Sequence, residues 1–424
     1  MSRPQKAVPV LQRSRRDWWA TGVITAVCAV AVAGAFFTAN IRATSLEATN
    51  PPGKDATVEQ LETIPTGFVE DARFNAPGVG NTRPVVAGGL VISVEGSTLV
   101  ASYPDGAEAW RYTRDDAPLC SLGTAWGSVV ATYRTGVGCG DVVSLNAKTG
   151  KYDSTRSAVS ADDVSPISSN DRVGTVAPER LELWRSDMVR TIEYGDIEAV
   201  QEPDTQPHEE CTITSALTRT SLLALTETCP VEGDDTDGND TQDWIRFMDT
   251  TPEDSREPEI DGERKIPAGS RLVSVGQEAA AVYAPETSGG TLIAINQESE
   301  ETKRSKVPGA PALNDDPSGV FTPVTADLPH HMSWFDGERL HLFIPSNQAH
   351  ARTIPDVIGT GVAVEDKLVV PTKDGLAVVN WFNAETERDI PLDRGDYTGP
   401  VTLSVAGDHI IEKRGDQLVS LRPD

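Results

Sequence analysis

PVVAGGLVISVEGSTLVASYPDGAEAWRYTR, residues 84–114, holds the strand and turn pattern that decides the fold. Alternating stretches rich in β-branched residues predict three strands, over residues 90–94, 98–103 and 109–113. Gly96-Ser97 separates the first two strands and Pro104-Asp105-Gly106 separates the second two, and both sequences favour tight turns. The stretch therefore predicts an antiparallel unit built from hairpins.

Similar units recur along the chain at a spacing of about forty residues, which indicates a repeat architecture. Eight units can be drawn, over residues 84–114, 124–156, 164–194, 212–249, 271–307, 331–357, 361–392 and 400–422. The last unit lacks a final strand, whereas the strand-like GFVEDARFN at residues 67–75 precedes the first unit without partners of its own. An N-terminal strand that completed the last unit would close a ring and remove its exposed edges.

We therefore predict an all-β fold over residues 65–424, an eight-bladed β-propeller of four-stranded blades. Seven blades are an alternative, because the unit at residues 164–194 is short of strand-forming residues. A pair of β-sandwiches is a second alternative, but it would need no repeat period.

An uncharged apolar stretch over residues 18–41, WWATGVITAVCAVAVAGAFFTANI, predicts a transmembrane helix. At about 1.5 Å per residue it spans the roughly 30 Å hydrocarbon core of a bilayer. Residues 1–17 contain five basic side chains, so the positive-inside rule predicts a cytoplasmic basic tail and an extracytoplasmic C-terminal domain in a single-pass protein of the cell membrane. A cleaved signal peptide is the alternative, because Ala33-Gly34-Ala35 supplies small residues. Residues 42–64 are polar and aperiodic, and we expect a flexible tether there.

Charge is distributed unevenly. The chain carries a formal net charge of −27, although its first 42 residues are basic. A strongly acidic outer domain repels phosphate backbones, so nucleic-acid binding is not expected.

Four cysteines follow the apolar stretch and form two local couples, Cys120 with Cys139 and Cys211 with Cys229. An even number in an exported domain predicts two structural disulfides, and local pairing is the simplest of the three connectivities. A zinc site is the alternative, but the spacing lacks a C-x₂-C signature and no histidine is placed to complete a ligand set.

The units resemble the PQQ-like β-propeller repeat, in which strands are followed by an Asp-Gly or Thr-Gly turn and a tryptophan. The best matches are Leu99-Val100-Ala101 with Asp105-Gly106 and Trp110, and Val142–Leu145 with Lys148-Thr149-Gly150; weaker ones are Leu292–Ile295 and Asp374-Gly375 with Trp381. The order of anchor, tether and propeller is also similar to that of actinobacterial envelope proteins. Quinoprotein dehydrogenases of this fold hold their cofactor over a tryptophan beside a disulfide of adjacent cysteines, with calcium. This chain has no adjacent cysteines, so the resemblance favours the binding members of the fold.

No catalytic, cofactor-binding or metal-binding set is predicted. His330, His331 and His341 form the histidine cluster of the sequence, but adjacent strand residues point to opposite faces, so structural histidines are expected. The acidic pairs Asp115-Asp116, Asp162-Asp163 and Asp315-Asp316 lie in turn-like contexts and are expected to be solvated. Asp235, Asp237 and Asn239 alternate as calcium ligands do, but Arg246 occupies the position where a calcium loop carries an acid.

These observations predict a non-enzymatic, membrane-anchored scaffold, without a cofactor, that binds other envelope proteins. The alternative is a PQQ-dependent oxidoreductase-like or small-ligand-binding propeller that uses its central channel.

Overall fold

The fold is taken from a computed structural model, which describes residues 14–48, 60–196, 205–231, 240–313 and 319–424. It begins with one long helix, α1 (Arg15–Thr38), which Ser14 and Asp17 cap reciprocally. All residues of α1 are exposed, and the helix is long and apolar enough to cross a membrane, as a signal sequence near the N-terminus would also be. The helix begins and ends three residues before the predicted segment.

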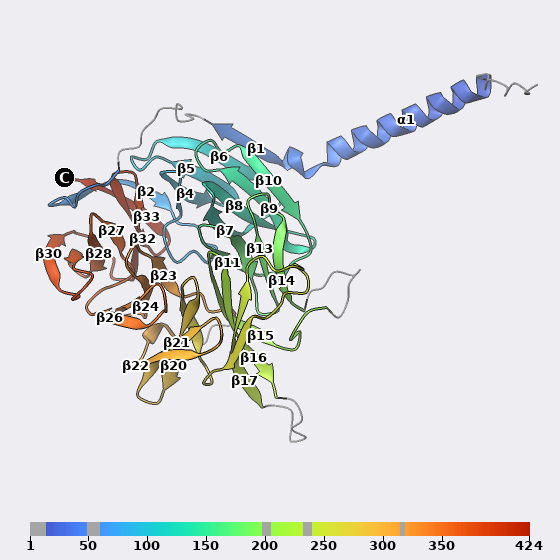
Figure 1. Cartoon of the computed structure of the whole chain (residues 1–424). Coiled ribbons are helices and arrows are strands. Elements are labelled where there is room, and N and C mark those ends of the chain that lie inside the picture. Colours follow the sequence, from blue (N-terminus) through green and yellow to red (C-terminus); the bar gives the residue numbers. More distant parts are fainter. Residues whose placement is uncertain (1–13, 49–59, 197–204, 232–239, 314–318) are drawn as a thin grey trace, which may run out of the picture.

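Eight antiparallel sheets follow and form a ring of blades (Figure 1). Blade 1 contains β3 (Val86–Ala87), β4 (Leu90–Glu95), β5 (Thr98–Ser102) and β6 (Glu108–Arg114), and blade 2 contains β7 (Leu119–Ala125), β8 (Ser128–Thr135), β9 (Gly138–Asn146) and β10 (Tyr152–Ser157). Blade 3 contains β11 (Ser165–Ser168), β12 (Val173–Val176), β13 (Arg180–Trp184) and β14 (Arg190–Gly195), and blade 4 contains β15 (Thr212–Arg219), β16 (Leu222–Pro230), β17 (Thr241–Asp249) and β18 (Gly262–Lys265). The eight-bladed propeller predicted from the sequence is confirmed.

Blades 5 to 8 repeat the same order. Blade 5 contains β19 (Arg271–Val275), β20 (Ala279–Glu286), β21 (Gly289–Asn296) and β22 (Glu301–Val307), and blade 6 contains β23 (Val324–Asp327), β24 (Met332–Phe335), β25 (Leu340–Phe343) and β26 (His350–Ile354). Blade 7 contains β27 (Val362–Val364), β28 (Lys367–Thr372), β29 (Gly375–Val379) and β30 (Thr386–Pro391), and blade 8 contains β31 (Val401–Ala406), β32 (His409–Arg414) and β33 (Gln417–Pro423). Two short 3₁₀ helices, η1 (Asn40–Ala43) and η2 (Pro311–Leu313), complete the described elements.

The ring closes as the sequence predicts. Strand β2 (Phe68–Asn75) pairs with β33 antiparallel, from Phe68 opposite Pro423 to Asn75 opposite Gln417, and completes blade 8. A bulge at Glu70 and Ala72 shifts the register once. The first propeller strand thereby covers the edge that the last strand would otherwise expose.

Blade 1 carries a fifth strand that the sequence did not predict. Residues Thr44–Ala48 form β1, which pairs with the outer edge of β6 from Thr44 opposite Arg114 to Ala48 opposite Trp110. This part of the expected tether at residues 42–64 is therefore a strand, and residues 49–59 of it lie outside the described residues. Only residues 39–43 separate α1 from the ring.

The hydrophobic core lies between the blades. Within the cluster shared by blades 1 and 2, Trp110 is fully buried and donates its indole N–H to the Ala147 carbonyl of blade 2 at 2.8 Å. A Cβ atom on Gly150, whose φ is +67°, would lie 2.8 Å from the Trp110 ring. The tryptophan of blade 1 and the Thr-Gly turn of blade 2 therefore pack against each other, and this contact joins the two blades.

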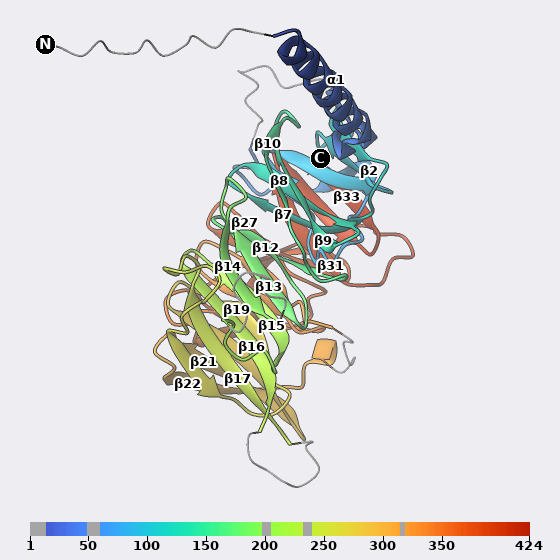
Figure 2. The same ribbon diagram turned by 90° about the vertical axis from the view of Figure 1, so that its right-hand side faces the viewer.

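The two faces of the ring are distinguished by the course of the strands (Figure 2 gives the view turned by 90°). Because neighbouring strands are antiparallel, the face where the innermost strands begin also holds the connections between blades, and we call it the connector face. The opposite face, where the innermost strands end, is called the turn face. Strand β1 begins beside Arg114, the last residue of β6, so the chain passes from α1 to the ring at the connector face.

Candidate functional site

One cavity lies in the central channel of the ring. It has a volume of about 490 Å³ and is lined by the innermost strands, or the segments beside them, of blades 1 to 6 and 8. Pockets of this volume bind small molecules in other proteins. The cavity is therefore large enough to hold a small ligand.

One end of the channel is crossed by a connecting segment. Phe321, which precedes β23 of blade 6, donates its backbone N–H to the Thr214 carbonyl of blade 4 at 2.8 Å and is itself buried. Residues 320–323 also line the cavity. Because Thr214 lies near the start of β15, this segment covers the channel toward the connector face.

Three charged side chains line the cavity, and two of them form a pair. Arg219 ends β15 and Asp327 ends β23, and the guanidinium meets the carboxylate through two hydrogen bonds of 2.9 and 3.1 Å. Both residues end innermost strands, so this pair lies toward the turn face. Its charges neutralise each other.

Arg83 is the third charged side chain and has no ionic partner among the described residues. It precedes β3 and is half-buried, and its Nε and Nη2 donate to the Leu403 carbonyl of blade 8 at 3.2 and 2.8 Å. Burial lowers the pKa of Arg83 to about 10, although the nearby Asp327 carboxylate opposes this shift. The guanidinium is therefore protonated at neutral pH and held by a carbonyl alone.

Asn81 adds a second polar group to the lining. Its amide N–H donates to the Leu122 carbonyl at 2.8 Å, whereas its Oδ1 is buried and has no hydrogen-bond partner within the described part of the chain. A buried polar atom without a partner is costly, and it marks a place where a ligand or water would be favourable.

The ionisable side chains among the described residues of the cavity lining are two arginines and one aspartate. No histidine, cysteine, lysine or glutamate is found among the described residues that line it, and the single aspartate already pairs with Arg219. The lining also offers no tryptophan, no acidic cluster and no disulfide of adjacent cysteines, so these residues do not fit a PQQ and calcium site.

Two disulfides join the cysteine couples, Cys120 with Cys139 and Cys211 with Cys229, in the local pairing expected from the sequence. Their Cα atoms are 6.0 and 4.2 Å apart. Cys120 lies at the start of β7 and Cys211 directly precedes β15, so both bonds lie at the connector face, in blades 2 and 4.

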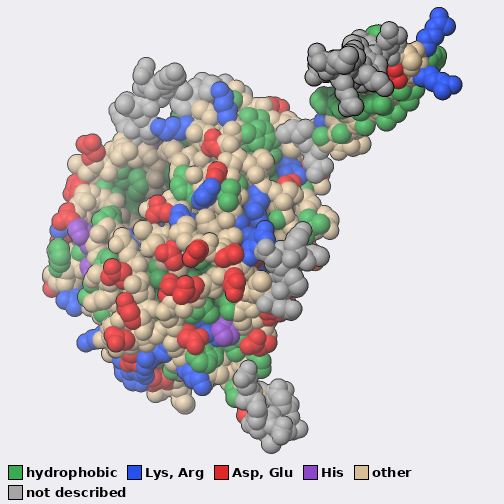
Figure 3. Space-filling model, turned by 45° about the vertical axis from the view of Figure 1, so that its right-hand side comes forward, with side chains coloured by type: hydrophobic (Ala, Val, Ile, Leu, Met, Phe, Trp, Pro, Cys, Tyr) green, Lys and Arg blue, Asp and Glu red, His purple; other side chains and the backbone are tan. Residues whose placement is uncertain are grey.

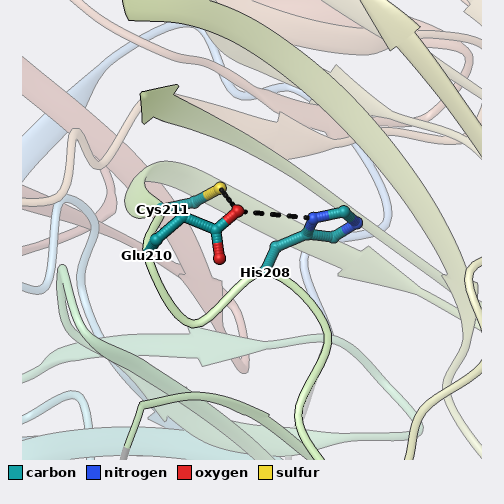
Figure 4. A group of neighbouring side chains, drawn as sticks. All are labelled: His208, Glu210 and Cys211. Atoms are coloured by element: carbon teal, nitrogen blue, oxygen red, sulfur yellow. Dashed lines mark hydrogen bonds and ion pairs between the residues drawn. The ribbon is translucent and has the colours of Figure 1, made fainter. Parts of the chain in front are cut away.

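The Glu210 carboxylate lies between the His208 ring and the sulfur of Cys211, a cysteine of the second disulfide (Figure 4). The His208 Nδ1 is 3.9 Å from Glu210 Oε1, which lies 3.8 Å from the Cys211 sulfur. Burial, followed by the nearby Arg246 charge, lowers the pKa of His208. These residue types bind metals, but a disulfide sulfur is not a thiolate ligand, so the cluster is not a metal centre while the bond is intact.

A buried ion network lies behind the disulfide. Glu227 and Arg246 are almost fully buried and hydrogen-bond to each other, and the Tyr194 hydroxyl donates to Glu227 at 2.6 Å. Burial raises the pKa of Tyr194, so its hydroxyl keeps its proton and acts as a donor. This network is paired internally and supports blade 4.

The predicted histidine cluster is divided by the structure. His330 contacts Asp366 at 2.7 Å, His331 stacks on Trp381, and His341 lies elsewhere, inside blade 6. Sequence reasoning missed the true neighbour of His341, which is His350, with 3.5 Å between their ring nitrogens. The register of β25 and β26 brings them together, a contact that the spacing of nine residues does not indicate.

His341 also takes part in a hydroxyl, imidazole and carboxylate array. Its Nδ1 is 3.1 Å from the Thr353 hydroxyl and its Nε2 is 3.0 Å from the Asp336 carboxylate. Such an array activates a nucleophile in hydrolases. His341 and Asp336 are completely buried here, however, so a substrate has no access to the imidazole.

The acidic pairs take the places expected of surface loops where they are described. Asp116 forms an ion pair with Arg114 at 2.7 Å, and Asp163 pairs with Arg134 and is 93% exposed. Asp315-Asp316 and the calcium-like residues Asp235, Asp237 and Asn239 lie outside the described residues.

No protein-family model matches the chain, and no curated protein sequence matches it. Among solved structures, apo AztD from Citrobacter koseri is 12% identical with a TM-score of 0.44, over 77% of this chain and 88% of that one. A chain of the mitotic checkpoint complex is 11% identical with a TM-score of 0.43, over 88% and 98% of the two chains. These distant likenesses carry no argument about function, and the fold assignment rests on the sheet topology.

Proposed function

We propose that the protein is a non-enzymatic scaffold of the cell envelope, anchored in the membrane by α1, with its N-terminus in the cytoplasm and its propeller outside. The observation that carries the proposal is the direct connection between α1 and blade 1. Five residues span at most about 17 Å, so a ring connected in this way stays beside the bilayer. Such a ring is positioned to bind other envelope proteins.

The surface chemistry supports protein binding more than catalysis. Acidic and basic side chains are interspersed over the visible face of the ring (Figure 3), and the cavity lining offers no nucleophile with an adjacent base among the described residues. Rigid scaffolds carry their binding residues on loops. The connector face holds the longer connections, and two exposed valines, Val137 and Val159, lie there beside the Cys120–Cys139 disulfide.

The test is affinity purification of the full chain from membranes after mild cross-linking. We expect a stoichiometric partner protein, and we expect Val137→Glu with Val159→Glu to lower its recovery. Val189→Glu is the matched control, because Val189 is equally exposed but lies at the turn face. Recovery of no stoichiometric partner would contradict the scaffold proposal, and equal recovery with all variants would contradict docking at the connector face.

A further inference from the structure

The charge of the central cavity is opposite to that of the whole chain. Two arginines and one aspartate line the cavity, which gives the lining a net charge of +1 among its described residues, whereas the chain carries −27. The large net negative charge of the chain already favours solubility, so a cation in the channel is not required for it. The positive charge in the channel therefore calls for an explanation of its own.

Arg83 is the source of this excess charge. Among the described residues Asp327 is the acidic group that influences it, and the two hydrogen bonds between Asp327 and Arg219 engage both oxygens of that carboxylate. Arg83 uses two N–H groups on the Leu403 carbonyl, and an arginine has five. A half-buried guanidinium thus retains donors and an uncompensated charge beside a cavity.

A guanidinium recognises oxyanions, because its planar donors match the two oxygens of a carboxylate or phosphate. One negative charge would neutralise a lining of +1, whereas a dianion would leave an excess negative charge near Asp327. We propose that the central channel binds a small organic monocarboxylate, with its carboxylate on Arg83 and its remaining atoms in the cavity. This proposal is independent of the scaffold function.

The competing explanation is that Arg83 only joins blades 1 and 8 through the Leu403 carbonyl. The two explanations differ in what the unchanged channel binds and in whether binding depends on Arg83. If Arg83 is only structural, the unchanged channel binds no anion, and any affinity that removal of the Asp327 charge creates comes from the freed Arg219 and does not depend on Arg83. If the channel is an anion site, the change frees Arg219 and strengthens anion binding.

The experiment measures binding of radiolabelled benzoate, with inorganic phosphate as the comparison, to the full chain in detergent by equilibrium dialysis at low ionic strength. We expect one saturable benzoate site per chain and weaker binding of phosphate. Asp327→Asn should tighten benzoate binding, and because this is a gain it cannot arise from unfolding. Arg83→Gln should weaken it about tenfold or more.

Arg185→Gln is the matched control, because Arg185 is an exposed arginine paired with Asp187 outside the channel, and it should bind benzoate as the unchanged protein does. Absence of saturable benzoate binding would overturn the proposal, as would unchanged affinity in both Asp327→Asn and Arg83→Gln. Tighter binding of phosphate than of benzoate would overturn the monocarboxylate assignment.

Discussion

Replacement of Gly150 by alanine tests the contact that joins neighbouring blades. The new Cβ would lie 2.8 Å from two atoms of the Trp110 ring and 3.0 Å from the Leu46 side chain of β1, all in a packed interface. Alanine at a φ of +67° costs about 1–2 kcal/mol, and overpacking a core adds about 1–3 kcal/mol. We therefore expect Gly150→Ala to lower the free energy of unfolding by about 3 kcal/mol.

Gly127→Ala provides the matched control within the same blade. Gly127 has a φ of +74°, but a Cβ there meets no atom within 4 Å, so only the backbone term applies. Urea unfolding of the full chain in detergent, followed by tryptophan fluorescence, should give a loss for Gly127→Ala that is smaller by about 1–3 kcal/mol. Equal losses for the two variants would refute the assignment of Gly150 as the counterpart of Trp110.

Three further changes have defined outcomes. Replacing Cys120 and Cys139 together by serine should lower the free energy of unfolding by about 3 kcal/mol, measured by urea denaturation. In the unchanged protein without reductant, neither of these two cysteines should react with iodoacetamide. Burial lowers the pKa of His350 to about 4, so as the pH falls the unfolded chain binds a proton on this histidine before the folded chain does. The free energy of unfolding should therefore fall as the pH falls from about 6.5 toward 4. His350→Gln should flatten this pH dependence in unfolding measurements at pH 7 and pH 5. Deletion of residues 1–48, compared with deletion of residues 1–43, should speed amide hydrogen exchange in β6, because only the longer deletion removes β1.

The repeat could be predicted because buried strands consist of apolar residues, and the closure of the ring could be predicted because one strand-like stretch had no partner. Residues 98–102 of β5 are buried throughout, and the strand-like residues 67–75 had no partner before the first unit. Strand β1 escaped prediction for the opposite reason. Its residues, TSLEA, lie half-exposed or exposed at the outer edge of blade 1, and Leu46 is the single large apolar side chain among them, so the strand shows no hydrophobic alternation.

The channel site could not be read from the sequence. Arg83 is one of many basic residues, and its meaning depends on Leu403, which lies on the last blade. The same holds for His341, whose neighbours His350 and Thr353 are set by strand register. The cysteine couples are identified by residue type within one blade, whereas a contact set by strand register or by closure of the ring leaves no such signal.

The pairing of β2 with β33 sets the order of events during synthesis. About 340 residues separate the two strands, which corresponds to roughly 20–70 s of translation. During that interval blades 1 to 7 receive their strands one after another, whereas blade 8 lacks β33 and strand β2 has no partner. Emergence of residues 417–423 from the ribosome is therefore the step that permits the native ring, so a chain that stops before residue 417 leaves an open array with two unpaired edges.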